Sequence, residues 1–284
     1  MNVQEMYKQK LVTAEEAAVK VKNKTEVWCG IAVPVPMALV NALIAREHEV
    51  EDITINQIVD IQPKLKWYDQ NRESNIKIDC GYPSVCRPKV QSGDFTLTPN
   101  RFCELPKIYT DENFRPMHVA MLMVTPMDRH GFFCLGLGAD ATLPIALNAA
   151  KKHREGDQRY QVLVQVNSQV PRSRGRNYIH ISDVNAIVEQ DQDLSVLPET
   201  TTVSEEEMTI GRYCAEFVKD GSTIQLGIGS IPNAVAKAFL DTHVKDLGIH
   251  SEMACDTMRE LWEEGIVTNR RKSFMPHRSI FTFA

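Results

Sequence analysis

Residues 222–253, with the sequence STIQLGIGSIPNAVAKAFLDTHVKDLGIHSEM, contain two short apolar runs separated by one helix-length segment. The first run ends in a glycine-rich turn, and the second ends at a carboxylate, Glu252, which we expect to lie among apolar residues. This order is typical of a strand–helix–strand unit. A right-handed crossover places the carboxyl ends of such strands at one edge of a sheet, where open α/β sheets bind ligands. We therefore expect Glu252 and the turn at 227–231 to lie along one rim.

The turn at 227–231 has the chemistry of an oxygen-binding loop. Glycines allow backbone conformations and a close ligand approach that other residues do not. The free N–H groups at the start of the following helix favour an anionic or carbonyl oxygen. The dinucleotide fingerprint G-x-G-x-x-G is not met, because Pro232 stands where the third glycine belongs. The alternatives are a tight structural turn for the glycines and a carboxylate that stabilises a helix N-terminus for Glu252.

Composition indicates an ordinary globular protein. The chain has 284 residues, of which 43% are hydrophobic and 24% charged, and a formal net charge of −5 with both signs interspersed. This balance favours neither nucleic acid nor an anionic membrane as a partner. No apolar run approaches the roughly 20 residues that span a bilayer. The start of the chain lacks the apolar core of a signal peptide, so we expect a cytoplasmic location.

The seven cysteines are scattered and include no C-x-x-C pair. Disulfide frameworks and zinc sites both prefer clustered, paired spacing, so we expect free, mostly buried thiols and no metal site. Basic clusters such as 151–154 and 172–176 are interpreted as solvated helix ends and loops. Contact with the phosphates of a small anionic ligand is the more specific alternative for one of them.

The first two thirds of the chain alternate between strand-like and helix-like segments. This alternation predicts a mainly parallel, doubly wound α/β sheet. Residues 81–106 contain several prolines and are expected to form surface loops, and 178–181 is expected to add a short piece near the end of the sheet. The expected strands are 26–29, 52–59, 76–78, 118–124 and 160–166, and the expected helices begin at 13, 36 and 143.

A polar, acidic stretch at 189–202 is the best candidate for a linker. We place a domain boundary near residue 195, which gives an N-terminal domain of 1–195 and a second domain of 196–284. The second domain is expected to contain helices 208–219, 231–241 and 256–264 with strands 223–226 and 247–250. A further strand at 279–283 then begins a unit that is not finished in this chain.

The motifs QLGIGSIPNAV and DLGIHSEM, in this order and at this separation, resemble those of the acetyl-CoA hydrolase/transferase family. The likeness is greatest to its 4-hydroxybutyrate and butyrate–acetate CoA-transferase branch, and GFFCLGLGADAT and VLVQVNSQVPRSRGRNYIHISDVNAIVE extend it over essentially the whole chain. The resemblance implies the CoA-transferase fold, in which two related open α/β domains occur. Family members continue beyond the position that matches Ala284, so the second domain is expected to be incomplete here.

The resemblance also implies a function. Glu252 would be the catalytic nucleophile and would form a glutamyl-CoA thioester, while acyl-CoA and small carboxylic acids would be substrates. No permanently bound cofactor or metal would be needed, and a homo-oligomer is the family expectation. The turn would lie against the CoA or acyl group, through Gly227, Ile228, Gly229, Ser230 and Ile231.

Several alternatives stay open at this point. The chain could be an acyl-CoA hydrolase, or an inactive truncated subunit of the same fold; a sugar-phosphate isomerase or a nucleotide binder ranks last. His250 could act as a base, but a packed or orienting histidine is favoured. Asn167 and Arg172 could face the acid substrate, or could be a loop cap and a surface charge. Gly136 and Gly138 could form a second backbone site or a helix-entry turn.

Overall fold

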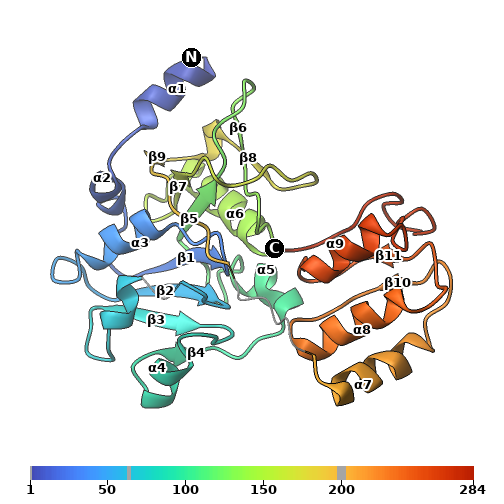
Figure 1. Ribbon diagram of the computed structural model, residues 1–284. Helices are drawn as coiled ribbons and strands as arrows, with labels where there is room; N and C mark the ends of the chain where they lie inside the picture. Colours follow the sequence, from blue (N-terminus) through green and yellow to red (C-terminus); the bar gives the residue numbers. More distant parts are fainter. Residues whose placement is uncertain (1, 63–64, 197–202) are drawn as a thin grey trace. The chain divides into compact units, whose positions relative to one another are not determined.

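The computed structural model describes residues 2–62, 65–196 and 203–284 (Figure 1). The chain divides into two compact units, Met1–Val196 and Leu197–Ala284, which are described one at a time. Part of the expected linker, 197–202, lies outside the described residues. Within the described part of the chain, no helix is long and apolar enough to cross a membrane.

The first unit is built on a seven-stranded sheet in which every neighbouring pair is parallel. The strand order is β4-β3-β2-β1-β5-β7-β9, so the chain winds outward from β1 in one direction and then returns to the other side of β1. The doubly wound parallel sheet is therefore confirmed. The strands are β1 (Thr25–Ile31), β2 (Ile53–Ile58), β3 (Ile76–Cys80), β4 (Thr96–Leu97), β5 (Val119–Val124), β7 (Gln161–Val166) and β9 (Ala186–Glu189).

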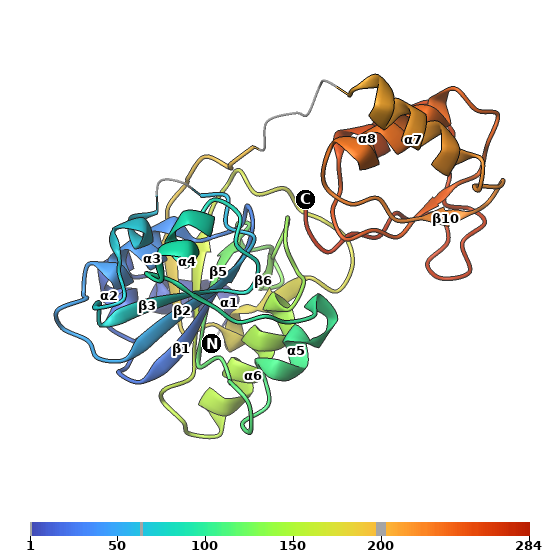
Figure 2. The same cartoon turned by 90° about the horizontal axis from the view of Figure 1, so that it is seen from below.

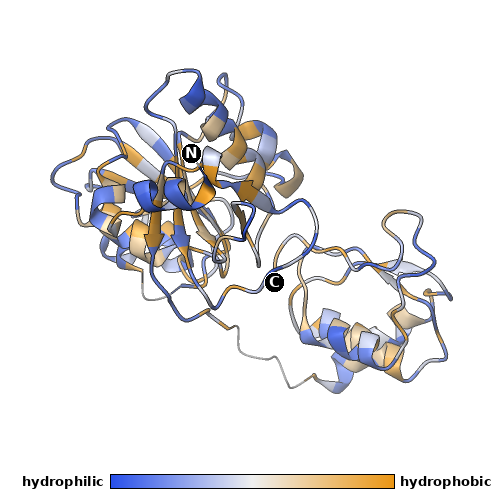
Figure 3. Ribbon diagram, turned by 90° about the horizontal axis from the view of Figure 1, so that it is seen from above, coloured by the Kyte–Doolittle hydropathy of each residue, from blue (hydrophilic) through white to orange (hydrophobic). Residues whose placement is uncertain are grey.

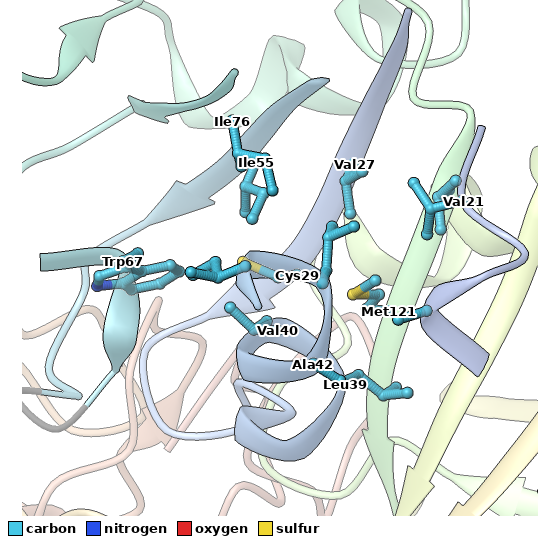
Figure 4. Packing of buried hydrophobic residues seen from close by; sticks show 14 of the residues in the cluster. Val21, Val27, Cys29, Leu39, Val40, Ala42, Ile55, Trp67, Ile76 and Met121 are labelled. Atoms are coloured by element: carbon cyan, nitrogen blue, oxygen red, sulfur yellow. The ribbon is translucent and has the colours of Figure 1, made fainter. Parts of the chain in front are cut away.

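Helices cover both faces of this sheet (Figure 2). Alternate strand residues point to opposite faces, as β1 illustrates. Val27 and Cys29 belong to the core cluster on the face that α3 (Met37–Ile44) covers (Figure 4). Trp28 points the other way, and its indole Nε1 donates a 2.9 Å hydrogen bond to Thr142 in α6. The covering helices are α2 (Ala14–Ala18), α3 and α4 (Arg87–Ser92) on one face, and α5 (Leu105–Ile108) and α6 (Thr142–Arg154) on the other.

Coverage on both faces explains why the central strands are nearly continuous apolar runs. All six residues of β5 and all six of β7 are buried, and Figure 3 shows the hydrophobic colour concentrated on the strands of this unit. Fully burying one Val, Leu, Ile or Met side chain contributes about 1.5–3 kcal/mol relative to exposure. The sheet and its two helical layers therefore hold the core of the first unit.

Two expectations for the first unit were wrong, and one strand was not expected. Residues 81–106 are not only loops, because they contain α4 and β4; Pro88 lies in the first turn of α4, where proline is tolerated, and Gly93 ends the helix with a φ of +78°. The strand β8 (Tyr178–His180) does not extend the large sheet but pairs antiparallel with β6 (Phe132–Cys134). The edge position belongs to β9, which the sequence analysis did not predict.

The remaining helices of this unit are short. The first, α1 (Val3–Lys10), begins with a capping box in which Asn2 and Glu5 bond reciprocally, a signal that the sequence analysis did not use. Three single turns of 3-10 helix also belong to the described part of this unit: η1 (Lys66–Asp69), η2 (Phe102–Glu104) and η3 (Ile181–Asp183).

All seven cysteines of the chain are free and four of them are buried, as expected.

The second unit is a small α/β structure. Ser204 and Glu207 form a capping box at the start of α7 (Glu205–Ala215), which begins and ends earlier than the expected helix 208–219. The strands β10 (Thr223–Ile224) and β11 (Gly248–Ile249) pair in parallel, and α8 (Ser230–Leu240) connects them. The expected strand at 279–283 appears as parallel bridges from Ile280 to His250 and from Phe283 to Met253. The last helix is α9 (Asp256–Glu263).

Candidate active site

The two turns singled out in the sequence follow adjacent strands of the second unit. Thr223 pairs with Gly248 and Ile224 with Ile249, so the carboxyl ends of β10 and β11 lie at the same edge. Ser251 ties these ends together: its buried Oγ donates a 2.8 Å hydrogen bond to the carbonyl of Leu226. The same Oγ accepts a 3.3 Å bond from the Leu226 N–H. The glycine turn comes directly after Leu226 in the chain, and Glu252 comes directly after Ser251. The bonds between Leu226 and Ser251 therefore bring the turn and Glu252 to the same edge, as the expected rim requires.

The glycine turn presents unpaired backbone donors. Gly229, with φ +130° and ψ −179°, precedes α8 and supplies no side-chain cap for the helix. Only glycine adopts this backbone conformation readily. None of the N–H groups of 227–231 donates a hydrogen bond to another group in the described part of the chain. Ile228 and Ile231 are exposed, and unpaired N–H groups at the start of a helix favour an oxyanion or a phosphate oxygen.

The side chain of Ser230 is already in use. Its hydroxyl donates a short hydrogen bond to Oε1 of Glu207, a residue of the capping box at the start of α7. This bond is the main reason that the pKa of Glu207 lies below its usual value. Ser230 can therefore contribute its backbone N–H to a ligand while its hydroxyl anchors the turn to α7.

Glu252 has a fixed backbone and a free side chain. Its carbonyl accepts hydrogen bonds from the N–H of Thr282 at 3.0 Å, from the Thr282 hydroxyl at 2.5 Å and from the N–H of Phe283 at 3.2 Å. Its carboxylate has no hydrogen bond or ion pair within the described residues, and the residue is exposed. The expectation of apolar surroundings was wrong for this unit taken by itself. A solvated carboxylate is a weak nucleophile, and desolvation would raise its reactivity.

His250 precedes Ser251 and Glu252 in the chain. It is exposed and stacks on Phe274, with ring centroids 6.2 Å apart and an interplanar angle of 24°. Its ring makes no hydrogen bond to any residue that the structure describes. The packed or orienting interpretation of His250 agrees with this stacking, and the structure gives the ring no partner for proton transfer.

Two side chains in the first unit that were considered for substrate contact serve the fold. The buried Asn167 donates a 2.8 Å hydrogen bond from Nδ2 to the carbonyl of Gln192 and accepts one of 3.0 Å at Oδ1 from the N–H of Gln169. Arg172 donates to the carbonyl of Pro126 and lies 4.0 Å from Asp128. These contacts favour the loop-cap and surface-charge interpretations over contact with the acid substrate.

The glycines at 136 and 138 lie in tightly packed turns. Gly136 has a φ of +62°, and a Cβ there would lie 2.2 Å from Cγ1 of Val170. A Cβ on Gly138 would lie 2.9 Å from the Pro34 ring. Close packing accounts for both glycines, in agreement with a helix-entry turn rather than a second backbone site.

The ligand-binding edge typical of doubly wound sheets is closed in the first unit. Oε1 of Gln165 accepts a 3.0 Å hydrogen bond from the N–H of Ala38, and Oε1 of Gln192 accepts one of 3.0 Å from Met37, at the start of α3. Gln192 also donates from Nε2 to the carbonyl of Val35 at 3.2 Å. The helix terminus that would face a dinucleotide phosphate is therefore satisfied by amide side chains, which argues against a nucleotide binder.

Comparison with known proteins gives one family. Residues 1–198 match the family model of the acetyl-CoA hydrolase/transferase N-terminal domain. Succinyl-CoA:cyclohexane-1-carboxylate CoA transferase of Geobacter metallireducens is 41% identical over 98% of this chain and 60% of its own length. The 4-hydroxybutyrate coenzyme A transferase of Clostridium kluyveri is 34% identical over 100% of this chain and 63% of its own length.

The fold has the same relatives. The crystal structure of RipA from Yersinia pestis matches with a TM-score of 0.86 at 29% identity, over 100% of this chain and 65% of that chain. The crystal structure of 4-hydroxybutyrate CoA-transferase from Porphyromonas gingivalis matches with a TM-score of 0.78 at 30% identity, over 99% of this chain and 63% of that chain, which confirms the α/β fold of CoA-transferase type. This chain spans 60% and 63% of the length of the two curated relatives.

Proposed function

The chain belongs to the acetyl-CoA hydrolase/transferase family, and from this membership we propose that it transfers CoA between small carboxylic acids through a covalent thioester on Glu252. The observation that carries the proposal is the bond between Ser251 and Leu226. It joins the residue before Glu252 to the residue before the glycine turn, and so brings a free carboxylate and unpaired N–H donors to one edge.

The reaction requires no change of oxidation state. The Glu252 carboxylate attacks the carbonyl carbon of an acyl-CoA, and collapse of the tetrahedral intermediate expels CoA thiolate and leaves an acyl-glutamyl anhydride. The thiolate attacks the glutamyl carbonyl of this anhydride, which releases the first carboxylate and leaves CoA on Glu252. A second carboxylate then reverses these steps and departs as the new acyl-CoA. The free energy of the thioester is retained throughout.

The N–H groups of the turn are suited to the charge that develops in these steps. Each tetrahedral intermediate carries an oxyanion, and fixed backbone donors stabilise such a charge without reorganising. We propose this role, or contact with CoA itself, for the turn. The contributing residues are Gly227, Ile228, Gly229, Ser230 and Ile231, with Ser230 acting through its N–H.

The substrates would be an acyl-CoA and a small carboxylic acid. The names of the relatives support acids of the 4-hydroxybutyrate, butyrate and acetate type, and one relative extends this range to a cyclic carboxylate. CoA is a substrate in this scheme and not a resident cofactor.

A direct test separates transfer from hydrolysis. The chain is incubated with butyryl-CoA with and without acetate, and acetyl-CoA and free CoA are quantified by mass spectrometry. We expect acetate-dependent formation of acetyl-CoA that is lost in Glu252→Gln and kept in Glu264→Gln, an exposed carboxylate of the same unit. Release of free CoA that does not depend on acetate would identify an acyl-CoA hydrolase instead. Absence of both products would contradict activity in this chain.

A further inference from the structure

Lys272 is a buried amine in the second unit. The residue is only 7% exposed, and its Nζ donates hydrogen bonds of 2.7 Å to the carbonyl of Ile249 and 2.6 Å to the carbonyl of Arg278. No carboxylate of the described residues lies within ion-pair distance of it, and burial lowers its pKa. Burying an ammonium without a counter-ion costs free energy unless its N–H groups donate hydrogen bonds. The two bonds to carbonyls therefore indicate that Lys272 holds the segments of Ile249 and Arg278 together.

Asn269, in the same turn, binds the neighbouring groups of the same two segments. Its Oδ1 accepts a 2.8 Å hydrogen bond from the N–H of Ile249, and its Nδ2 donates one of 3.0 Å to the hydroxyl of Ser279. Asn269 is 4% exposed and has a φ of +58°, a conformation that asparagine tolerates better than most residues. The N–H and the C=O of Ile249 are thus both held by side chains of one turn, which also holds residues 278 and 279.

The two segments held by this turn are the ones that fix Glu252. The chain from Ile280 to Phe283 runs beside the extension of β11: the N–H of Ser251 donates to the carbonyl of Ile280 at 2.9 Å, and Thr282 and Phe283 donate to the carbonyl of Glu252. We name Asn269 and Lys272 the clamp, because they join β11 to this segment just before it reaches Glu252.

Gly248 shows how closely the clamp packs on the strand. A Cβ at this position would lie 2.4 Å from Cγ of Lys272 and 2.8 Å from its Cδ. The glycine of the GIHSEM motif therefore leaves room for the lysine stem, although its own backbone is in an ordinary strand. Gly248 of the motif and Lys272 of the clamp are 24 positions apart in the sequence, but they are neighbours in the fold.

From this geometry we infer that Asn269 and Lys272 are positioning residues that hold the Glu252 peptide, and through it the direction of the carboxylate, relative to the glycine turn. The catalytic consequence rests on the proposed role of Glu252. The structural consequence stands independently of it, because the clamp acts on backbone hydrogen bonds that can be measured without turnover.

The first experiment measures amide hydrogen exchange in the full chain. Lys272→Met removes both carbonyl bonds and keeps the length of the stem, whereas Arg271→Met removes an exposed cation next to it. We expect exchange at Ser251, Thr282 and Phe283 to be about 10- to 100-fold faster in Lys272→Met than in wild type, as for the loss of hydrogen bonds from a charged group. Exchange in β5 and in Arg271→Met should not change. Wild-type exchange rates in Lys272→Met would overturn the inference.

The second experiment separates positioning from general stability. At saturating butyryl-CoA, thioester formation on Glu252 should be about 10- to 100-fold slower in Lys272→Met, with KM for butyryl-CoA within about threefold and partial rescue in Lys272→Arg. Equal rates in Lys272→Met and wild type would reject the catalytic consequence. If wild type forms no thioester, the proposed function fails, and hydrogen exchange still decides the clamp.

A milder variant serves if Lys272→Met does not fold. Ser279→Ala removes the acceptor of the Asn269 Nδ2–H and leaves the bond from the Ile249 N–H to Asn269 Oδ1 in place. Faster exchange confined to residues 249–253 and 280–283 would support the clamp, and uniformly unchanged exchange would overturn it.

Discussion

Each of the two units has a parallel sheet edge followed by a helix N-terminus. The two edges differ in whether the N–H groups at the start of that helix have hydrogen-bond acceptors within the described residues. In the first unit, Gln165 and Gln192 accept hydrogen bonds from the first N–H groups of α3. In the second unit, the turn before α8 has no such acceptor in the described chain, and Glu252 beside it is exposed. The N–H groups at the start of α3 are thus paired with amide side chains, whereas those of the turn before α8 have no partner within the described residues.

The difference shows that a fold-level rule does not locate a site by itself. Ligands of doubly wound sheets bind outside the carboxyl ends of the strands, and the first unit has the larger sheet of that kind. The state of the hydrogen-bonding groups decides which edge can accept a ligand. Each of the following variants tests one side of this comparison.

Glu252→Gln should have the largest effect. The amide keeps the size of the side chain but cannot form the anhydride or the thioester, so acetate-dependent CoA transfer from butyryl-CoA should fall at least ~1,000-fold. Because Glu252 is exposed and its side chain makes no hydrogen bond within the described residues, thermal unfolding should be unchanged. Transfer at a rate near that of wild type would show that another carboxylate is the nucleophile.

Gly229→Ala should have the next largest effect. A residue with a side chain at φ +130° and ψ −179° costs on the order of 1–3 kcal/mol, and the turn can relieve this strain only by moving its N–H groups. We expect kcat/KM for CoA transfer to fall roughly 10- to 100-fold, by loss of oxyanion stabilisation.

The matched control is Gly265→Ala. Gly265 also has a positive φ, +74°, and nothing lies within 4 Å of its added Cβ. This variant should lose about 1 kcal/mol of stability with unchanged transfer. Equal losses of transfer in both variants would mean that backbone strain, and not the position of the turn, causes the effect.

Gln165→Leu tests the closed edge of the first unit. The change leaves the N–H of Ala38 and the carbonyl of Gln190 without partners, so the free energy of unfolding should fall by about 1–3 kcal/mol in urea titration. Gln91→Leu, at an exposed position in α4, should change it by less than about 0.5 kcal/mol. Loss of thioester formation at unchanged stability would instead assign ligand contact to this edge.

A change at Asp140, before α6, should give the smallest effect, and its size depends on pH. Its Oδ1 accepts from the N–H of Thr142 at 2.9 Å, while the buried Oδ2 has no partner among the described residues. Burial raises the pKa of Asp140 to about 6, above the value of about 3.9 in an unfolded chain. Between these values the folded state binds more protons, so stability falls as pH rises through this window.

Asp140→Asn removes this titration. The variant should therefore gain on the order of 1–2 kcal/mol over wild type above pH 6 and little below pH 4, as measured by urea unfolding at several pH values. A gain that is the same at pH 4 and pH 7 would contradict an origin in the ionised carboxylate.

The sequence alone was sufficient to predict those helices and strands whose signal is local. Continuous apolar runs located β5 and β7 to within a residue or two, and the first helix of the second unit was predicted with its start three residues too late. Weak elements were missed or misplaced: β8 has three residues and β9 four, too few for a periodic pattern to distinguish an edge strand from a loop.

The site was predictable in its parts but not in its contacts. The turn and Glu252 could be paired from the order of strand, helix and strand. The bonds of Ser230 to Glu207 and of Lys272 to Ile249 join residues 23 positions apart in each case. Such pairs depend on tertiary packing, and neither glutamate nor lysine carries a local pattern that would reveal its partner. The exposure of Glu252 was likewise beyond the reach of the sequence.

The central claim is that Glu252 carries CoA, and peptide mass spectrometry tests it most directly. The chain is incubated with butyryl-CoA, reduced with borohydride, digested and compared with an untreated sample and with Glu252→Gln. A glutamyl thioester is reduced to an alcohol, so the account predicts a mass shift on the peptide that contains Glu252, present only in wild type and dependent on butyryl-CoA. An unmodified Glu252 peptide in folded chain that binds CoA would contradict the account.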